Sequence, residues 1–166
     1  MTLDDADAAA LHALLTALDP PLTVVTVEAG GERSGCLVGF LCQCSIDPPR
    51  LLVCLSKRNH TYRVARGADG LAVQLLGEDQ LDVAELFGGR TGDEVDKFTA
   101  TDWRPGDGGT PVLADARGWA AGRILDRFDA GDHEAFLVEV TAAGGRPEGA
   151  LLHLRHAVDI EPGHDA

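Results

Sequence analysis

Short apolar runs separated by polar turns recur along most of the chain, and this pattern predicts a domain built mainly from β-strands. Several strands joined by short turns, with a few short helices, are typical of a small closed or partly open β-barrel. The first three strands follow one another closely, so we expect them to form an antiparallel meander. Strands are expected at residues 22–27, 35–45, 50–56, 71–76, 112–114, 117–128, 134–142 and 151–154.

Helical spacing of apolar residues is clearest at the start of the chain, over residues 3–18. Leucines there recur among alanines, and acidic residues in the first turn suit the positive end of the helix dipole. Pro20 and Pro21 end this helix. Shorter helices are expected at 61–66 and 79–87. Residues 88–111 are rich in Gly, Asp and Thr and predict a long irregular segment anchored by Phe98 and Trp103.

The stretch from Ser34 to Tyr62 combines two apolar strands with a polar turn. The strands are joined at Asp47-Pro48-Pro49, and the second strand leads into the turn Ser56–Thr61. Lys57, Arg58 and Arg63 form the densest basic cluster of the chain. An apolar double strand that ends in such a turn could seat a flat ligand with an anionic tail. The alternative is an ordinary solvated turn.

Size and charge limit the classes of partner. The 166 residues, of which 45% are hydrophobic and 25% charged, suit one globular domain spanning 1–166 with an acidic tail at 159–166. A net charge of −13 repels phosphate backbones, so nucleic acid is not expected as a partner. No apolar run approaches the roughly 20 residues that span a bilayer, and residues 1–5 lack the basic region and apolar core of a signal peptide. These observations predict a cytoplasmic protein that does not contact membranes.

The cysteines and histidines do not follow the spacings of known metal sites. Cys36, Cys42, Cys44 and Cys54 include no Cys-x-x-Cys pair, and we expect all four to be reduced and packed as small apolar side chains. His153 and His156 are three apart in an expected strand, where that spacing puts them on opposite faces. The chain therefore predicts neither a metal site nor a disulfide framework.

Gly131-Asp132-His133-Glu134 is the short motif, outside Ser34–Tyr62, that most suggests chemistry. A histidine at the turn between two strands can reach over the mouth of a barrel and donate a hydrogen bond or a proton near neutral pH. The alternative is a plain β-turn, in which Gly-Asp is common. G-x-G-x-x-G, Walker A and G-x-S-x-G sequences are absent, so Rossmann, P-loop and serine-hydrolase sites are not expected.

Taken together, the motifs resemble the flavin reductase-like family, the FMN-binding split barrels, from about Asp19 to about Asp159. The order of the motifs along the chain carries the resemblance more than any single motif does. The matching segments are Leu22-Thr23-Val24-Val25-Thr26, the strand from Gly35 to Cys44-Ser45-Ile46-Asp47-Pro48-Pro49, Asn59-His60-Thr61-Tyr62, Leu71-Ala72-Val73-Gln74-Leu75-Leu76, Asp96-Lys97-Phe98, Trp103, Gly109-Thr110-Pro111-Val112-Leu113 and Gly131-Asp132-His133.

The resemblance implies a homodimeric Greek-key split barrel that binds FMN or FAD near the subunit interface. It also implies hydride transfer from NADH or NADPH to the flavin, which can then serve a partner monooxygenase. The catalytic residue it implies is His133, beside the nicotinamide or the flavin edge. The residues it places at the flavin are Val38, Gly39, Phe40 and Leu41 beside the isoalloxazine, and Gln43, Cys44, Ser45, Ser56, Lys57, Arg58, Asn59, His60 and Thr61 around the ribityl-phosphate.

The strand after Gly35 departs from the family pattern. The family places Thr, Ser or Asn where this chain has Leu37, Gly39 and Phe40. Two alternatives to a flavin reductase follow from this change. One is a non-catalytic protein that stores or senses flavin, and the other is a split barrel that binds another planar cofactor, such as a deazaflavin or haem.

Overall fold

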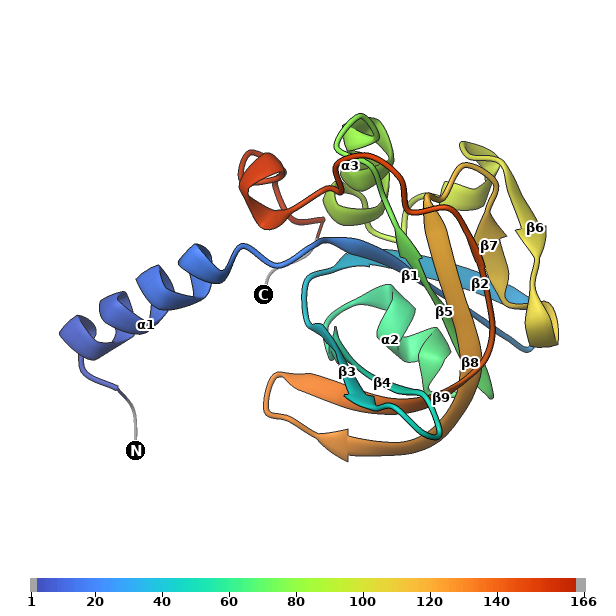
Figure 1. Cartoon of the computed structure of the whole chain (residues 1–166), viewed down its shortest axis with the longest axis horizontal. Coiled ribbons are helices and arrows are strands. Elements are labelled where there is room, and N and C mark those ends of the chain that lie inside the picture. Colours follow the sequence, from blue (N-terminus) through green and yellow to red (C-terminus); the bar gives the residue numbers. More distant parts are fainter. Residues whose placement is uncertain (1–2, 164–166) are drawn as a thin grey trace.

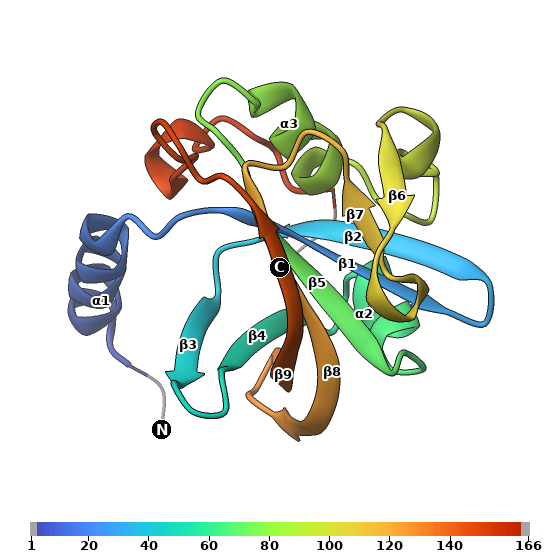
Figure 2. The same cartoon turned by 45° about the vertical axis from the view of Figure 1, so that its right-hand side comes forward.

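An antiparallel sheet of seven strands forms the body of the computed structural model, which describes residues 3–163. The strands lie in the order β2-β1-β5-β8-β9-β4-β3, and the sheet curls on itself around α2 (Figures 1 and 2). This is the expected mainly β split barrel. Its strands are β1 (Thr23–Ala29), β2 (Glu32–Val38), β3 (Leu41–Ser45), β4 (Arg50–Ser56), β5 (Gly70–Leu75), β8 (Gly118–Asp129) and β9 (His133–Gly145).

Pairing between the strands is only partly sequential. β1 and β2 form a hairpin whose turn residues, Gly30 and Gly31, both have positive φ. β5 returns to pair with β1 instead of β4, which is the non-sequential connection of a Greek key. β8 and β9 form a long hairpin that joins the two halves of the sheet. Gly122 allows their close approach, because a Cβ there would lie 2.1 Å from the carbonyl oxygen of Glu139.

The expected single strand at 35–45 is wrong: it is two strands, β2 and β3, interrupted at Gly39 and Phe40. β2 pairs with β1 and β3 pairs with β4, so the two strands occupy opposite edges of the sheet. The expected three-stranded meander is therefore wrong as well. A single straight strand could not pair with both β1 and β4, because the curl of the sheet separates these two strands.

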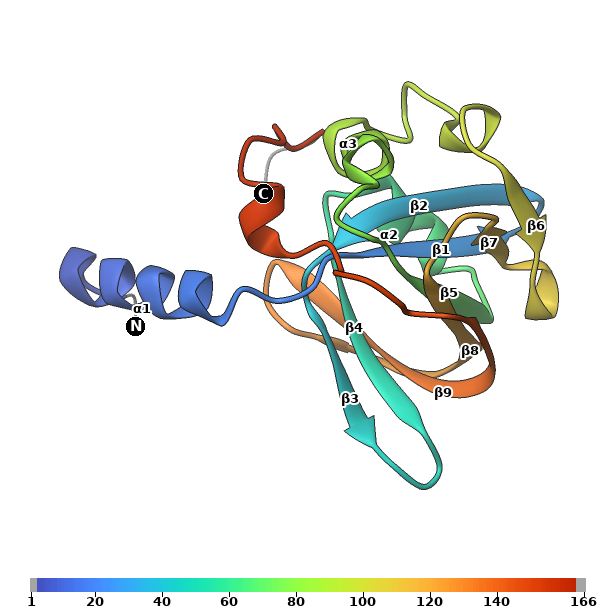
Figure 3. The same ribbon diagram turned by 45° about the horizontal axis from the view of Figure 1, so that its top comes forward.

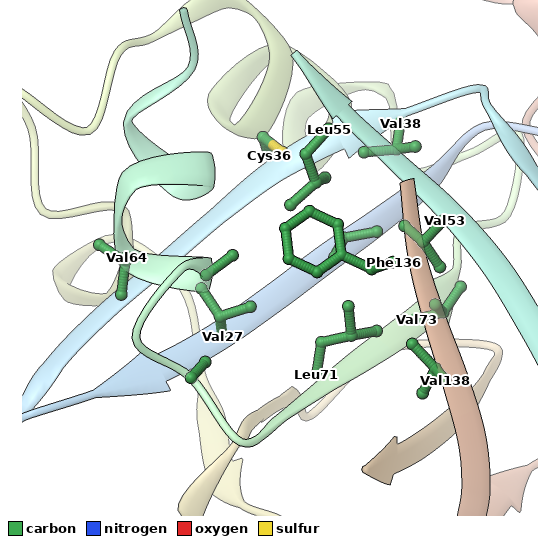
Figure 4. Close-up of a cluster of buried hydrophobic side chains, with 13 residues drawn as sticks. Val27, Cys36, Val38, Val53, Leu55, Val64, Leu71, Val73, Phe136 and Val138 are labelled. Atoms are coloured by element: carbon green, nitrogen blue, oxygen red, sulfur yellow. The ribbon is translucent and has the colours of Figure 1, made fainter. Parts of the chain in front are cut away.

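Buried side chains fill the inside of the curl with one principal cluster. Figure 4 shows Phe136 at its centre, fully buried, with Leu55 and Leu71 beside it. Alternation along each strand supplies these residues, since every second side chain points inward. The helix α2 (His60–Ala65) closes one end and contributes Val64. A second cluster lies between β1 and α3 (Leu81–Gly89) and includes Leu22, Val24, Phe87, Phe98 and Leu152.

Residues 88–111 are more regular than the sequence indicates. They contain two 3₁₀ turns, η1 (Lys97–Thr99) and η2 (Asp107–Gly109), and β6 (Trp103–Pro105) pairs with β7 (Pro111–Leu113). Phe98 is buried and its ring meets that of Trp103 edge-on, with 5.8 Å between the centroids. The two aromatic residues thus anchor the segment as expected.

Two expectations near the C-terminus are wrong. Residues 151–154 do not form a strand: Leu151 and His153 make isolated bridges, and the 3₁₀ turn η3 (Leu154–His156) follows. His153 and His156 do not lie on opposite faces of a strand, and their ring centroids are 6.3 Å apart. The turn brings them together because it repeats about every three residues. Of the acidic tail at 159–166, residues 164–166 lie outside the described residues.

The helix α1 (Asp5–Leu18) projects away from the sheet in all three views (Figures 1, 2 and 3). Asp4 caps its first turn by accepting a hydrogen bond from the Asp7 N–H. Among the residues that the structure describes, none of α1 is buried. Within residues 3–163, no helix has the length and apolar character needed to cross a bilayer.

Lys97 is a buried cation that ties η1 to the barrel. Its Nζ donates hydrogen bonds to the carbonyl oxygens of Gly35 and Phe87, at 3.0 and 2.9 Å. Burial disfavours the ammonium and lowers the pKa of Lys97 from 10.5 to about 8. The neutral amine is therefore reached at a lower pH in the folded protein than in the unfolded chain.

We expect stability to depend on pH through Lys97. Between about pH 8 and 10.5 the unfolded chain binds this proton and the folded protein does not, so stability rises with pH across that window. The rise amounts to about 3 kcal/mol at most. Urea unfolding of the wild type and Lys97→Met from pH 7 to 10.5 measures it as the change in their stability difference. Parallel curves for the two proteins would contradict the prediction.

Candidate functional site

The outward side of β3, β4, β9 and β8 carries a group of apolar residues, which we call the outer face. Register defines it: Cys42 lies opposite Leu52, and Leu52 lies opposite Leu137. The alternate residues of β4, Val53 and Leu55, point into the core. The outer face consists of Phe40, Cys42, Leu52, Cys54, Phe128 and Leu137, with the buried Ala135 between Cys54 and Phe128 and the exposed Asp126 at its edge opposite Leu137.

Phe40 and His133 meet at one end of the outer face. The Phe40 carbonyl accepts a hydrogen bond from the Cys54 N–H at 3.0 Å, which fixes Phe40 beside β4. Its side chain stays 61% exposed, and its ring lies 5.1 Å from the His133 ring between centroids, tilted by 53°. His133 is the residue opposite Ser56 in the register of β9 with β4. Both strands expected within Ser34–Tyr62 thus lie next to the histidine turn expected at Gly131-Asp132-His133-Glu134.

His133 is oriented by its neighbour in the same turn. Its Nδ1 donates a hydrogen bond to the Asp132 carboxylate at 2.8 Å. That hydrogen bond and the charge of His133 hold the pKa of Asp132 below its ordinary value. With Nδ1 bound to Asp132, Nε2 is the nitrogen left to face a ligand.

Lys57 joins the polar turn to the His133 turn. Its Nζ donates to the Gly131 carbonyl oxygen at 2.6 Å and pairs with the Asp129 carboxylate at 2.9 Å. Its backbone N–H donates to the Asp132 carbonyl oxygen at 3.0 Å. The Gly131 N–H and then Lys57 lower the pKa of Asp129. Lys57 thus holds two turns together, whereas Arg58 beside it is exposed to solvent.

The end of the polar turn serves the start of α2. Asn59 caps the helix by accepting a hydrogen bond from the Thr61 N–H at 3.0 Å. The Thr61 hydroxyl is buried and lies 2.9 Å from the Ser34 hydroxyl. The Asn59 and Thr61 side chains therefore support the backbone of the turn. Only backbone N–H groups that the first turn of α2 does not use can face outward.

His60 points toward a different hollow from the outer face. Its Nε2 lies 2.9 Å from the Glu32 carboxylate and its Nδ1 lies 2.9 Å from the Asp93 carboxylate. Arg63 also binds Asp93, and first Arg63 and then His60 lower the pKa of Asp93 to about 2. The hollow measures about 370 Å³ and is lined mainly by the start of β2 and by residues 92–98.

The predicted flavin residues therefore fall into several groups. The structure brings together Phe40, Ser56, Lys57 and His133. Gln43, Cys44 and Ser45 follow along β3 toward its far end, where Gln43 Nε2 donates to the Ser45 carbonyl oxygen at 3.1 Å. Arg58 is exposed beside this group, and Asn59 caps α2. The other predicted residues lie elsewhere: the Val38 side chain is buried, Gly39 is half-buried, Leu41 packs against the core, and His60 and Thr61 are engaged as described above.

The expectation that all four cysteines pack as small apolar side chains is wrong for two of them. Cys36 is buried, and burial raises the pKa of its thiol to about 11. Cys42 and Cys44 are exposed, and Cys54 is half-buried. Burial, and then Cys42, raise the pKa of Cys54. Cys42 and Cys44 are exposed because β3 is an edge strand and no other part of the described chain covers its outward side.

Sequence reasoning missed several residues of this site. Asp129, which holds Lys57, and the apolar outer-face residues Leu52, Phe128 and Leu137 were not singled out, and Asp132 was named in the turn motif without its role of holding His133. Alternation along 50–56 and 134–142 could have placed Leu52 and Leu137 on one face. Among residues 3–163, no group of three or more His, Cys, Asp or Glu side chains could hold a metal ion.

Comparison with known proteins identifies the relatives of this chain. The chain is 37% identical over 150 residues to an FMN reductase (NADH), RutF 1, of Methylorubrum extorquens, which covers 89% of this chain and 73% of the relative. It is 36% identical over 143 residues to a probable flavin reductase of Rhizobium meliloti, covering 86% of this chain but only 45% of that protein. The chain thus spans less than half the length of the second relative.

The fold agrees with these sequence relationships. The structure of nitrilotriacetate monooxygenase component B from Mycobacterium thermoresistibile matches with a TM-score of 0.77 and 27% identity, covering 88% of this chain and 80% of that one. Residues 16–160 match the flavin reductase like domain. The chain therefore belongs to the flavin reductase-like domain family.

Proposed function

We propose that the protein transfers hydride from NADH or NADPH to FMN or FAD. The observation that carries the proposal is the meeting of Phe40 and His133 at the end of an apolar outer face, in a chain whose residues 16–160 match the flavin reductase like domain. The FMN reductase (NADH) of Methylorubrum extorquens, at 37% identity, supports NADH as the reductant and FMN as a flavin.

The residues present fit a flavin. An isoalloxazine needs a flat apolar surface, which Phe40, Cys42, Leu52 and Cys54 provide. A phosphate needs a cation or several N–H donors, and Arg58 lies exposed in the turn that ends β4. Bound flavin would supply the acceptor for a hydride, whose chemistry belongs to the cofactor. The protein supplies position and charge.

His133 is the residue we assign to the nicotinamide side or the flavin edge. Asp132 fixes its ring through Nδ1, so that Nε2 can hydrogen-bond a carboxamide or a ring nitrogen of a substrate. Lys57 keeps this turn next to the polar turn after β4. The arrangement orients two ligands at one edge of the outer face.

Reduced flavin is useful when a second enzyme consumes it. The similarity to component B of nitrilotriacetate monooxygenase supports a role in supplying reduced flavin to a monooxygenase. The proposal also includes a homodimer, in which the flavin lies near the interface. The outer face is an open surface in a single chain, which agrees with a site that a second subunit completes.

A second candidate is a non-catalytic protein that stores or senses flavin. The segment from Leu37 to Leu41 favours it, because no side chain there carries a hydroxyl or amide that could hydrogen-bond the flavin ring. Such a protein would bind flavin and be yellow as purified, without turnover. A deazaflavin or haem as the natural ligand would be recognised by the absorption spectrum of the protein as purified.

Steady-state assays test the proposal. Oxidation of NADH or NADPH by the purified protein should depend on added FMN or FAD, and reduced flavin should accumulate when oxygen is excluded. Background oxidation with both nucleotides and both flavins, together with measurable flavin binding, would favour the storage or sensing protein instead.

Replacing Arg58 should weaken FMN binding through the phosphate. Loss of one charge-assisted contact corresponds to roughly a 10- to 100-fold higher Kd. Arg58→Ala should therefore raise the Kd of FMN by about that factor and leave the Kd of riboflavin, which lacks the phosphate, nearly unchanged. Fluorescence titration with the two ligands measures both constants. An equal change for FMN and riboflavin would show that Arg58 does not contact the phosphate.

Replacing His133 should reduce turnover more than flavin binding. A positioned acid-base or hydrogen-bonding histidine contributes roughly 10²–10⁴-fold to a rate. We expect His133→Ala to lower kcat/KM for NADH by about 100-fold while changing the Kd of FMN little. Exposed His12 on α1 provides a matched control, since His12→Ala also removes an imidazole, from an element that contributes no residue to the outer face. Unchanged kcat/KM in His133→Ala would remove this residue from the mechanism.

A further inference from the structure

The hollow beside the start of β2 has residues 91–96 as one of its walls, and we call these residues the wall segment. The hollow measures about 370 Å³, a volume in the range of small-molecule pockets, and it shares no lining residue with the outer face. Thr91 folds the wall segment back on itself, because its carbonyl oxygen accepts hydrogen bonds from the Glu94 and Val95 N–H groups, both at 3.2 Å. What holds this segment against the barrel therefore controls the shape of the hollow.

His60 joins the wall segment to β2 through its two ring nitrogens. Nε2 lies 2.9 Å from the carboxylate of Glu32 on β2, and Nδ1 lies 2.9 Å from the carboxylate of Asp93 in the wall segment. The His60 side chain is only 16% exposed. Gly92 leaves room for the ring, since a Cβ there would lie 2.7 Å from His60 Cδ2. One imidazole on α2 thus contacts both sides of the hollow.

The two contacts of His60 are both hydrogen bonds only when the ring carries two protons. An ionised carboxylate can only accept, and a neutral imidazole has one N–H group and one lone pair. In the neutral ring, one of the two carboxylates would face that lone pair at 2.9 Å, which is a repulsive contact. The protonation of His60 therefore decides whether both sides of the hollow are held.

Arg63 decides which of the two contacts is lost. Its Nη2 lies 3.2 Å from His60 Nδ1 and also pairs with the Asp93 carboxylate. A guanidinium can only donate, so it favours the neutral tautomer that has the lone pair on Nδ1 and the proton on Nε2. That tautomer keeps the hydrogen bond to Glu32 and loses the one to Asp93. Asp93 stays ionised meanwhile, because first Arg63 and then His60 lower its pKa to about 2.

The other charged groups around the hollow are engaged elsewhere or exposed. They are Arg33, Glu94, Asp96 and Lys97. Arg33 lies over the Trp103 ring, Asp96 caps η1, Lys97 binds two backbone carbonyl oxygens, and Glu94 is exposed to solvent. His60 is the first residue of α2, where the helix dipole disfavours a cation. The carboxylates of Glu32 and Asp93 are therefore the groups that favour its charged form.

We propose that His60 is a pH-sensitive clamp that holds the wall segment against β2. Protonated His60 binds Glu32 and Asp93 together and keeps the hollow closed on that side. Neutral His60 releases Asp93, and the wall segment moves away from β2. Histidine changes charge near neutral pH, so the clamp is engaged at low pH and is lost as the pH rises. This switch goes beyond the proposed function, since it needs neither flavin nor hydride transfer.

Glu32→Gln should keep the clamp engaged at high pH. The new amide can donate to Nε2 of the neutral ring, whose Nδ1–H then donates to Asp93. Hydrogen exchange of the Asp93, Glu94 and Val95 amides, divided by the intrinsic rate at each pH, measures how firmly the wall segment is held. From pH 5 to 9 the wild type should lose at least about tenfold in protection relative to Glu32→Gln, because one charge-assisted hydrogen bond is lost. Lys97 titrates in both proteins, so its effect cancels in this ratio.

Two further variants serve as controls for the clamp. His60→Phe keeps a ring against Gly92 but removes both nitrogens, so its wall segment should be weakly protected at every pH. Glu94→Gln removes an exposed carboxylate of the same hollow and should keep the pH dependence of the wild type. The same pH dependence in the wild type and Glu32→Gln would overturn the proposal, and so would wild-type protection in His60→Phe at pH 5. The comparison with Glu32→Gln decides the matter where His60→Phe does not fold.

Discussion

The site depends on one constraint: the chain passes from one edge of the sheet to the other through Gly39 and Phe40. β2 must pair with β1, and β3 must pair with β4, so the chain has to change its pairing partner between Val38 and Leu41. The Phe40 carbonyl satisfies this break by accepting the Cys54 N–H. The same hydrogen bond places the Phe40 ring next to His133. Sheet closure and site formation are therefore the same event.

The negative charge of the whole chain opposes the binding of an anionic ligand at the candidate site. With a net charge of −13, the field at long range disfavours an anionic nucleotide. Several cations are already neutralised locally: Lys57 pairs with Asp129, and Arg63 pairs with Asp93. A phosphate-bearing ligand would thus rely on short-range hydrogen bonds and on Arg58 instead of on a basic surface. Its affinity should depend on contact geometry more than on ionic strength.

Local sequence patterns predicted the positions of helices and strands. Pairing between distant strands determined where the chain breaks between strands and which side chains are exposed. The apolar run 50–56 and the leucine spacing in 3–18 gave β4 and α1 nearly to the residue. The break at Gly39 and the exposure of Cys42 could not be read locally, because both depend on which edge of the sheet β3 joins. Lys57 looked like a free cation in the sequence, since its partner Asp129 lies 72 residues further along the chain. The motif order along the chain, in contrast, was enough to identify the family.

The attachment of Lys57 to the tip of the β8–β9 hairpin has a consequence for how the site can move. The turn that would receive the phosphate and the turn that carries His133 share three hydrogen-bonding contacts through this residue and cannot shift independently. A ligand that draws the Ser56–Thr61 turn toward itself also moves the imidazole. The polar turn after β4 and the tip of the β8–β9 hairpin therefore behave as one rigid unit, held by a single lysine.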